Sequence, residues 1–261
     1  MLGAIIGDIA GSIYEFTPVK SYDFPLMVDT EKKLFFTDDT VLTIAIADAL
    51  MNNKNLPVTV ANYCRAYPFR GYGGNFSEWI YSDLAPYGSY GNGSAMRVSS
   101  VGYIGKDEKD VLRLAKKTSV ITHDHIEGIK GAQSIALAIH LAKNGASKDT
   151  IKRTVESTFG YNLSKSLSAI EANYGFDETC QGSVPEAFVA FLESSDYESA
   201  IRNAIWLKGD ADTQACIAGG IAEAFYQEIP EDFKEKALAL LDERMLRVLQ
   251  QFSMNYVELG R

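Results

Sequence analysis

Hydrophobic side chains recur with a helical period along most of this chain. Apolar residues three or four positions apart form stripes within residues 2–13, 41–49, 111–120, 129–139, 187–192, 213–226 and 233–252. This spacing places apolar side chains on one face of an α-helix, whereas a half-buried strand would alternate them. The pattern therefore predicts an all-α fold.

Extended segments are few. Only residues 22–28 and 34–36 look like strands, and Pro25 interrupts the first of them. Helix boundaries are better marked, because Asn144-Gly145 predicts a helix end and Ser147 predicts the next N-cap. Prolines that favour helix starts stand at Pro57, Pro185 and Pro230.

The chain has no internal repeat of fixed period, and no segment between the predicted helices has the composition of a linker. We therefore expect residues 1–261 to form one domain. Residues 66–93 are the least helical part and are rich in glycine and tyrosine. Long ordered loops in compact domains often carry function, so this loop is a candidate site.

Charge and cysteine content narrow the class of protein. The 34 acidic residues outnumber the 25 basic ones, for a formal net charge of -9, and no run of Lys or Arg is present. This balance argues against a protein that tracks nucleic-acid phosphates or binds a membrane surface. The three cysteines are far apart in the sequence, which favours neither a disulfide framework nor a thiolate zinc site and is typical of a reducing compartment.

The apolar N-terminus does not have the features of a signal peptide, because no basic residue precedes Lys20. The longest apolar stretch, residues 41–51, is much shorter than the roughly 18 residues that a membrane span needs. We therefore expect a cytoplasmic protein that makes no contact with a membrane. We also expect a monomer.

Three glycines are spaced four residues apart near the N-terminus, at Gly3, Gly7 and Gly11. On a helix they share one face, and each costs up to about 1 kcal/mol in helix propensity relative to Ala. A close helix crossing is the simplest explanation. Glu15 follows at the expected end of this helix, and a solvated carboxylate is the simplest interpretation of that residue alone.

Two acidic clusters stand immediately before predicted apolar helices. They are Thr37-Asp38-Asp39-Thr40 and Gly209-Asp210-Ala211-Asp212-Thr213. Helix capping would explain either cluster alone. If the two helix starts converge, however, four carboxylates share one site and repel one another unless divalent cations neutralise them.

Oxygen ligands without nearby Cys or His favour hard cations, with Mg²⁺ first, Mn²⁺ and Ca²⁺ as alternatives, and Zn²⁺ disfavoured. Two cations would balance four carboxylates. They could also position a water and polarise sugar or phosphate oxygens.

A glycine-rich loop opens a helix at Tyr87-Gly88-Ser89-Tyr90-Gly91-Asn92-Gly93-Ser94-Ala95-Met96-Arg97. Free amides at such a helix start can bind phosphate, and the tyrosines could stack on a base. Ordinary turn chemistry explains most such loops, and this one has neither a Walker lysine nor Rossmann spacing.

Histidine content excludes one class of phosphohydrolase. The chain has only His123, His125 and His140, so no histidine precedes His123-Asp124 as a helical His/Asp site requires. A histidine at position 123 can cap helix carbonyls or contact a ligand. Leu42 stands where a terpene-synthase motif would need its third aspartate.

Taken in order along the chain, these motifs resemble those of the ADP-ribosylglycohydrolase family. The matching segments are Gly7-Asp8-Ile9-Ala10-Gly11 with Glu15, Thr37-Asp38-Asp39-Thr40, Gly91-Asn92-Gly93-Ser94-Ala95-Met96-Arg97, Thr122-His123 and Gly209-Asp210-Ala211-Asp212-Thr213. Each segment alone is weak evidence for the family, but the occurrence of all of them in this order is specific to it. The Gly-x-Tyr-Gly-Asn-Gly pattern is most similar to the serine-directed branch of the family.

The resemblance implies an orthogonal multi-helix bundle with two Mg²⁺ or Mn²⁺ ions in a central cleft. The metal ligands that it implies are Thr37, Asp38, Asp39, Asp210, Asp212 and Thr213. It implies that Glu15 or Asp39 handles the proton, Glu15 being aligned with a flap glutamate. Residues implied to contact substrate are Tyr87, Gly88, Ser89, Tyr90, Gly91, Asn92, Gly93 and His123, with the diphosphate and proximal ribose on the loop and adenosine near His123.

The activity that the resemblance implies is hydrolysis at the anomeric carbon of the distal ribose, which releases ADP-ribose from a modified protein or small acceptor. A nucleic-acid adduct is also open as substrate. Two alternatives remain: a catalytically silent ADP-ribose-binding or structural member of the fold, and a Mg²⁺-dependent nucleotide phosphohydrolase. The segment between Glu15 and Thr37 is short for the family, and residues 70–83 match no specificity signature, so the linkage is open.

Overall fold

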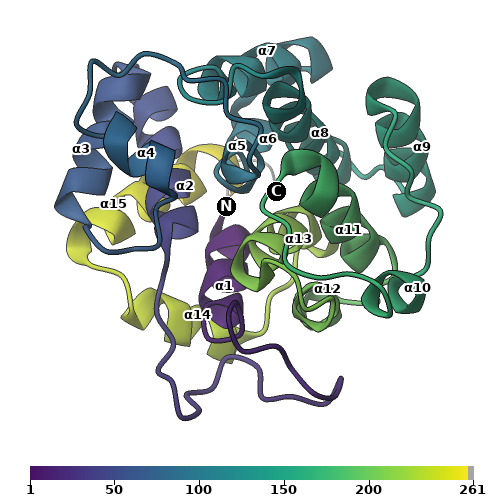
Figure 1. Cartoon of the computed structure of the whole chain (residues 1–261). Helices are drawn as coiled ribbons and strands as arrows, with labels where there is room; N and C mark the ends of the chain where they lie inside the picture. The colour runs from purple at the N-terminus through teal and green to yellow at the C-terminus, as the bar shows by residue number, and fades with distance from the viewer. Residues whose placement is uncertain (258–261) are drawn as a thin grey trace.

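The structure, a computed structural model, describes residues 1–257. In that range every regular element is a helix, which confirms the predicted all-α class (Figure 1). The nearest approach to a sheet is a single antiparallel bridge between Gly91 and Thr179. None of the helices found between residues 1 and 257 is long and apolar enough to cross a membrane.

The fold is built around two antiparallel helices, α1 (Leu2–Gly11) and α13 (Ala211–Tyr226), whose backbones touch. A Cβ added to Gly7 would lie 2.0 Å from the Ala215 carbonyl oxygen, and one added to Gly11 would lie 2.4 Å from the Asp212 Cα. No larger side chain fits these spaces without moving a helix. The predicted close crossing is therefore confirmed, and it places the end of α1 beside the start of α13.

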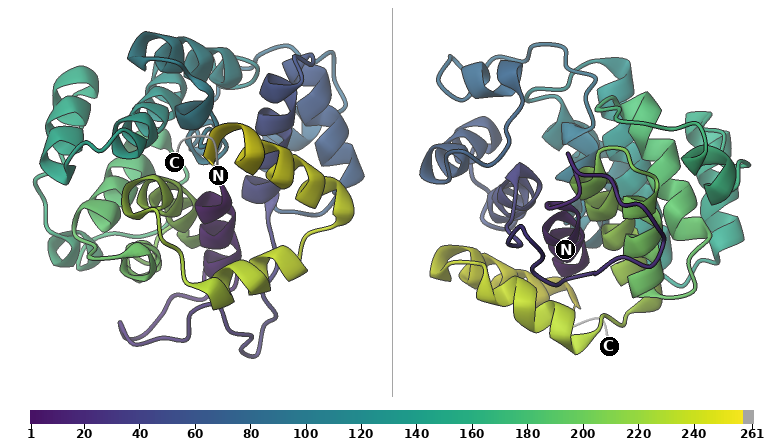
Figure 2. Two further views of the ribbon diagram at one scale, coloured as in Figure 1. Left: turned by 180° about the vertical axis from the view of Figure 1, so that it is seen from behind. Right: turned by 60° about the horizontal axis from the view of Figure 1, so that its bottom comes forward.

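Helices pack around this central pair on two sides (Figure 1). On one side, α2 contacts α1, α3 and α15, while α14 contacts α1 and runs with α15 across the back of the molecule (Figure 2). Their bounds are α2 (Asp38–Met51), α3 (Leu56–Ala66), α4 (Gly74–Trp79), α14 (Glu231–Ala239) and α15 (Glu243–Phe252), which a π-helix, η1 (Ser253–Val257), continues.

On the other side, α8 packs on α13 and is covered by α7 and α9, while α11 and α12 cover the rest of α13. The bounds on this side are α5 (Gly93–Met96), α6 (Val101–Ile104), α7 (Glu108–Ser119), α8 (Ile126–Lys143), α9 (Lys148–Phe159), α10 (Leu167–Glu171), α11 (Cys180–Leu192) and α12 (Tyr197–Trp206). The predicted N-cap of α9 is confirmed, because Ser147 Oγ accepts from the Thr150 amide.

The expectation of strands at residues 22–28 and 34–36 was wrong. Both segments belong to the long loop between α1 and α2 and form no strand; Met27, in the first of them, has a positive φ of 51° (Figure 2). Pro25 cannot donate to a ladder, and its carbonyl accepts from the Tyr14 hydroxyl instead. Their buried apolar side chains, Phe24 among them, pack into the core rather than against a sheet.

Three helix boundaries also differ from the sequence pattern. The stripe at residues 233–252 belongs to two helices, because Asp242 caps α15 by accepting from the Met245 amide. The pattern at residues 187–192 is the end of α11, which begins seven residues earlier and contains Pro185. Within the predicted loop at residues 66–93, residues 74–79 form α4.

Candidate active site

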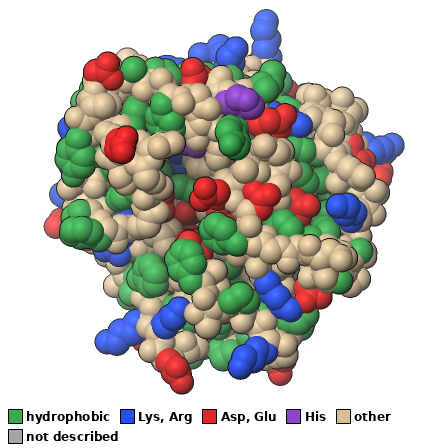
Figure 3. Space-filling view, viewed as in Figure 1, with side chains coloured by type: hydrophobic (Ala, Val, Ile, Leu, Met, Phe, Trp, Pro, Cys, Tyr) green, Lys and Arg blue, Asp and Glu red, His purple; other side chains and the backbone are tan. Residues whose placement is uncertain are grey.

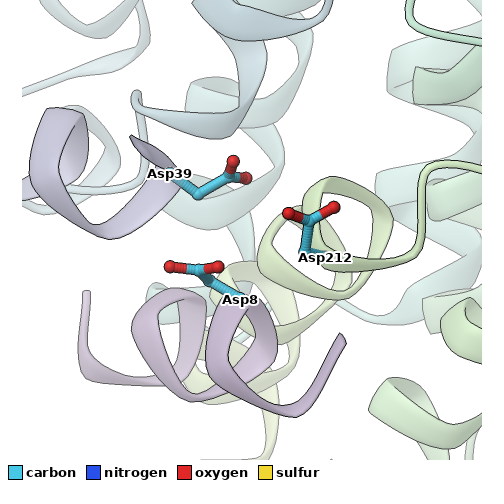
Figure 4. A group of neighbouring side chains, drawn as sticks. All are labelled: Asp8, Asp39 and Asp212. Atoms are coloured by element: carbon cyan, nitrogen blue, oxygen red, sulfur yellow. The ribbon is translucent and has the colours of Figure 1, made fainter. Parts of the chain in front are cut away.

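The two acidic clusters meet where α2 and α13 begin, which is the convergence that the sequence analysis had left as a condition. Asp39 at the start of α2 and Asp212 at the start of α13 point toward one another, and Asp8 of α1 completes the group (Figure 4). One carboxylate oxygen from each of the three lies within 4.8 Å of the others. All three residues are buried.

A second group shares one member with the first. Glu15, Asp210 and Asp212 also each offer an oxygen within 4.8 Å of the others. Asn92 Nδ2 donates to Asp210 Oδ2 at 2.8 Å, which fixes that carboxylate and connects it to the glycine-rich loop. Asp212 therefore lies between two adjacent clusters of oxygen atoms.

Asp8 is the functional residue that the sequence analysis missed. Its carboxylate accepts from the Thr37 amide at 3.0 Å, the Thr37 hydroxyl at 2.7 Å, the Thr40 amide at 3.1 Å and the Thr40 hydroxyl. A side chain of α1 thus caps the start of α2, where a negative charge is favoured. The sequence signals were an aspartate within an apolar helix and its place in the family-like segment Gly7-Asp8-Ile9-Ala10-Gly11.

The other predicted metal ligands lie in or beside the same region. Thr213 Oγ1 donates to Asp39 Oδ2 at 3.4 Å, and Thr37 is the N-cap of α2. Asp38 is half-buried and lines the cleft, but it belongs to neither carboxylate group.

Burial and mutual repulsion raise the pKa values of these carboxyl groups. Burial raises the pKa of Asp8 to about 6 even though its hydrogen bonds act in the opposite direction. Burial, followed by the charges of neighbouring aspartates, raises the pKa values of Asp39 and Asp212 well above their usual range. Asp39 Oδ1 is buried and has no hydrogen-bond partner in the described chain. Carboxylates so arranged fit divalent cations, which would supply both the missing partner and the missing charge.

Glu15 lies at the mouth of the cleft and is half-buried. Burial, together with the charges of Asp210 and Asp8, raises the pKa of its carboxyl group to about 7. The simple reading of Glu15 as a solvated carboxylate was therefore wrong, because the side chain faces an acidic cleft. A carboxyl group with a pKa near neutrality can exchange a proton at working pH.

The cleft runs from the carboxylates to the glycine-rich loop and opens at the face shown in Figure 3, where acidic side chains surround a hollow. Most of the predicted substrate residues line it: Tyr87, Ser89, Gly91, Asn92, Gly93 and His123. Gly88 and Tyr90 do not line it. The Gly88 amide donates to Asp124 Oδ1 at 2.7 Å, and the exposed ring of Tyr90 lies 5.3 Å from that of His125.

Most backbone amides of this loop are already engaged. The amides of Gly91 and Asn92 donate to Ser89 Oγ and to the Glu178 carbonyl, at 3.2 and 2.8 Å. The Ser89 amide donates to the Thr122 carbonyl at 3.3 Å. Within the described residues, the amides of Tyr90 and Gly93 have no protein acceptor. The loop therefore offers fewer free amides to an anion than its sequence suggested.

Sequence and structure comparisons agree on the family. A family model described as ADP-ribosylglycohydrolase matches residues 1–258. The chain is 26% identical to ADP-ribosylhydrolase ARH3 of Mus musculus over 97% of this chain and 91% of that protein. It is also 26% identical to ADP-ribosylarginine hydrolase Tri1 of Pseudomonas putida, over 90% of this chain and 72% of that protein.

A solved structure described as an ADP-ribosylglycohydrolase-related protein complex is similar with a TM-score of 0.70 at 25% sequence identity. The likeness covers 94% of this chain and 96% of that chain. The resemblance predicted from the motifs and the predicted hydrolase class are confirmed by these matches. The chain belongs to the ADP-ribosylglycohydrolase family.

Proposed function

We propose that this chain is a divalent-cation-dependent ADP-ribosyl hydrolase that cleaves the bond at the anomeric carbon of the distal ribose and releases ADP-ribose. The observation that carries the proposal is the pair of carboxylate groups sharing Asp212. They lie in one cleft with a glycine-rich loop and His123. The carboxylates would bind ribose hydroxyls through cations, and the donors of the loop would bind a diphosphate. The two features side by side suit a substrate that has both groups.

Two Mg²⁺ or Mn²⁺ ions are proposed, one at each carboxylate group. Asp8, Asp39 and Asp212 would hold the first, and Asp210 and Asp212 the second, next to Glu15, with Thr37, Asp38 and Thr213 as further oxygen donors beside them. When bound, such cations supply Lewis-acid polarisation of ligand oxygens. The protein supplies a rigid frame, because α1, α2 and α13 each fix one of the aspartates.

The reaction requires proton transfer and stabilisation of an oxocarbenium-like transition state. Glu15 would transfer the proton, because it is half-buried and lines the cleft beside Asp210 and Asp212. Asp39, which also lines the cleft, is the alternative base. Asn92 holds Asp210 in place, and the buried walls limit access of bulk water.

The ADP part of the substrate is proposed to lie along residues 87–93 and His123, which gives an anionic ligand local donors in an otherwise acidic protein. Contacts with Gly88 and Tyr90 need a different local conformation from the one described here, because Gly88 is bonded to Asp124.

The candidate substrates differ in the linkage between ADP-ribose and its acceptor. The names of the two relatives above differ on this point, since one specifies arginine and the other specifies no residue. We propose a modified protein or a small ADP-ribose conjugate as substrate, and the experiment must include both serine-linked and arginine-linked forms.

A panel of defined ADP-ribosylated substrates tests the proposal. The protein is dialysed against a chelator, supplied with Mg²⁺ or Mn²⁺, and assayed for free ADP-ribose. We expect release only with added cation, loss of release in Asp212→Asn, and unchanged release in Asp232→Asn on the exposed start of α14. Release of phosphate or a nucleotide instead would support the phosphohydrolase. Binding of ADP-ribose without turnover on any substrate would support the silent member of the family.

A further inference from the structure

A fully buried arginine lines the same cleft as His123 and has no carboxylate partner among residues 1–257. Arg97 is 0% exposed, and its Nη2 donates to the Thr118 carbonyl at 3.0 Å and to Thr122 Oγ1 at 2.8 Å. Its Nε and Nη1 have no hydrogen-bond partner in the described chain. Burying an unpaired charge is costly, so a fully buried guanidinium at this position requires an explanation.

Thr122 connects this arginine to His123. A guanidinium can only donate hydrogen bonds, so Thr122 Oγ1 accepts from Arg97. The same hydroxyl lies 2.7 Å from His123 Nδ1, which is its one other partner among residues 1–257. The hydroxyl has a single proton, and among the described residues Nδ1 is the acceptor that lies within its reach.

This arrangement selects one tautomer of the His123 ring. If Nδ1 carried a proton, the buried hydroxyl of Thr122 would have no acceptor for its own proton, which is unfavourable. With Nδ1 unprotonated, the hydrogen bonds run in one direction, from Arg97 Nη2 to Thr122 Oγ1 and from Thr122 Oγ1 to His123 Nδ1. The ring proton then lies on Nε2.

The Nε2 edge of the ring faces the glycine-rich loop. A Cβ added to Gly93 would lie 3.1 Å from His123 Nε2, and one added to Gly91 would lie 3.7 Å from it. His123 lines the cleft at this point, and its Nε2 has no partner within the described part of the chain. Because most amides of the loop are engaged, Nε2–H is one of the few free donors there.

We propose that Arg97 and Thr122 are positioning residues that hold His123 with its proton on Nε2, so that this donor meets a phosphate or ribose oxygen of ADP-ribose above Gly91 and Gly93. The inference rests on the proposed function, in which the cleft binds ADP-ribose. The buried charge of Arg97 also disfavours a second proton on the ring, because burial and this arginine lower the pKa of His123 well below its usual range. The ring therefore stays a neutral donor.

The tautomer is measured first, without ligand, by ¹⁵N NMR of the histidine side chains at neutral pH. The chain has only three histidines, and comparison with His123→Asn assigns the signal. We expect a pyridine-type Nδ1 and a protonated Nε2 in the unaltered protein and in Thr122→Ser, which keeps the hydroxyl. In Thr122→Val, which removes the donor at similar volume, we expect signal from the other tautomer. A protonated Nδ1 in the unaltered protein overturns the proposal.

Calorimetry with ADP-ribose then tests what the tautomer does. Thr122→Val should weaken binding by about five- to tenfold, the usual effect of one misdirected hydrogen bond. Thr122→Ser should restore most of the affinity. The matched control is Thr59→Val, because Thr59 is buried in α3 away from the cleft and its change should leave the affinity unaltered.

The outcomes distinguish the positioning role of Arg97 and Thr122 from the proposed binding of ADP-ribose. Equal ADP-ribose affinity in Thr122→Val and the unaltered protein overturns the positioning role. If the unaltered protein fails to bind ADP-ribose, the proposed function and the ligand named here both fail. The ligand-free NMR spectrum would even then decide whether Arg97 and Thr122 set the tautomer.

Discussion

At the scale of single residues, Asp8 has both a structural role and a place in the proposed cation site. Its carboxylate caps the start of α2 through Thr37 and Thr40 and also belongs to the first carboxylate group. Asp39 belongs to the same group but is held more weakly: the Thr213 hydroxyl donates to it at 3.4 Å, while the Thr37 hydroxyl, also 3.4 Å away, donates its proton to Asp8 at 2.7 Å. The two aspartates should therefore respond differently to substitution.

We expect Asp8→Asn to destabilise the metal-free protein by about 2–4 kcal/mol, because an amide presents NH₂ to backbone and hydroxyl donors that a carboxylate accepts. Asp39→Asn should leave the free energy of unfolding unchanged or raise it, since it removes repulsion. Urea denaturation in a chelator measures both. Equal destabilisation by the two variants would contradict the division of roles.

Glu15 is the residue whose substitution should separate binding from turnover. Glu15→Gln keeps the size of the side chain but removes the titratable group, so turnover should fall by roughly 10²- to 10⁴-fold while ADP-ribose still binds. Glu31→Gln, in the exposed part of the same loop, is the matched control. A fall of only a few-fold would transfer the proton-transfer role to Asp39.

The sequence predicted which residues form this site better than it predicted the hydrogen bonds that hold them. Local motifs revealed Asp39, Asp210 and Asp212, because clustered carboxylates before apolar helices are visible in the sequence itself. The role of Asp8 depends on where α2 lies relative to α1, and the Asn92–Asp210 bond joins residues 118 positions apart. Contacts of this kind follow from packing, which a single sequence does not show.

At the scale of helices, the crossing of α1 and α13 sets the spacing of the carboxylates. Gly7 and Gly11 let the two backbones touch, and this contact places Asp8 and Glu15 beside Asp212. The glycines are thus part of the site although they carry no functional group.

Gly7→Ala should destabilise the protein by about 1–3 kcal/mol or more and weaken cation binding, because its Cβ would lie 2.0 Å from the Ala215 carbonyl oxygen. Gly175→Ala is the control, since a Cβ there meets nothing within 4 Å. Thermal unfolding and Mn²⁺ titration of the two variants measure the effects. A stable Gly7→Ala protein with full Mn²⁺ affinity would show that the crossing can relax.

Helical periodicity predicted the main helices but not every boundary. The stripe at residues 233–252 continues in phase through residues 240–242, so hydrophobicity alone could not reveal the break that Asp242 caps. The segments at residues 22–28 and 34–36 have strand composition, yet neither pairs with another segment within residues 1–257. Strand formation depends on a partner that local sequence does not specify.

At the scale of the whole molecule, the raised carboxyl pKa values link cation binding to pH. The folded state binds protons at Asp8 up to about pH 6, above the ordinary value of 3.8. Such a group favours the metal-free fold below pH 4 and loses that contribution as the pH rises through 6. The pKa values of Asp39 and Asp212 are raised as well, so these two groups affect stability in the same direction as Asp8.

Cations must displace these protons, so the rise in melting temperature at a fixed Mn²⁺ concentration should be larger at pH 7.5 than at pH 5.5. Samples without Mn²⁺, matched in ionic strength with NaCl, provide the baseline at each pH. An equal or larger Mn²⁺ effect at pH 5.5 would contradict carboxylate ligation.

The central claim, that two carboxylate groups sharing Asp212 each hold a divalent cation, is tested most directly by counting bound Mn²⁺ per chain. Equilibrium dialysis with the unaltered protein should give two ions. Asp39→Asn and Asp210→Asn should each retain one, Asp212→Asn should retain neither with full affinity, and the control Asp232→Asn should retain both. Two ions bound with undiminished affinity in Asp212→Asn, or none bound by the unaltered protein, would contradict the account.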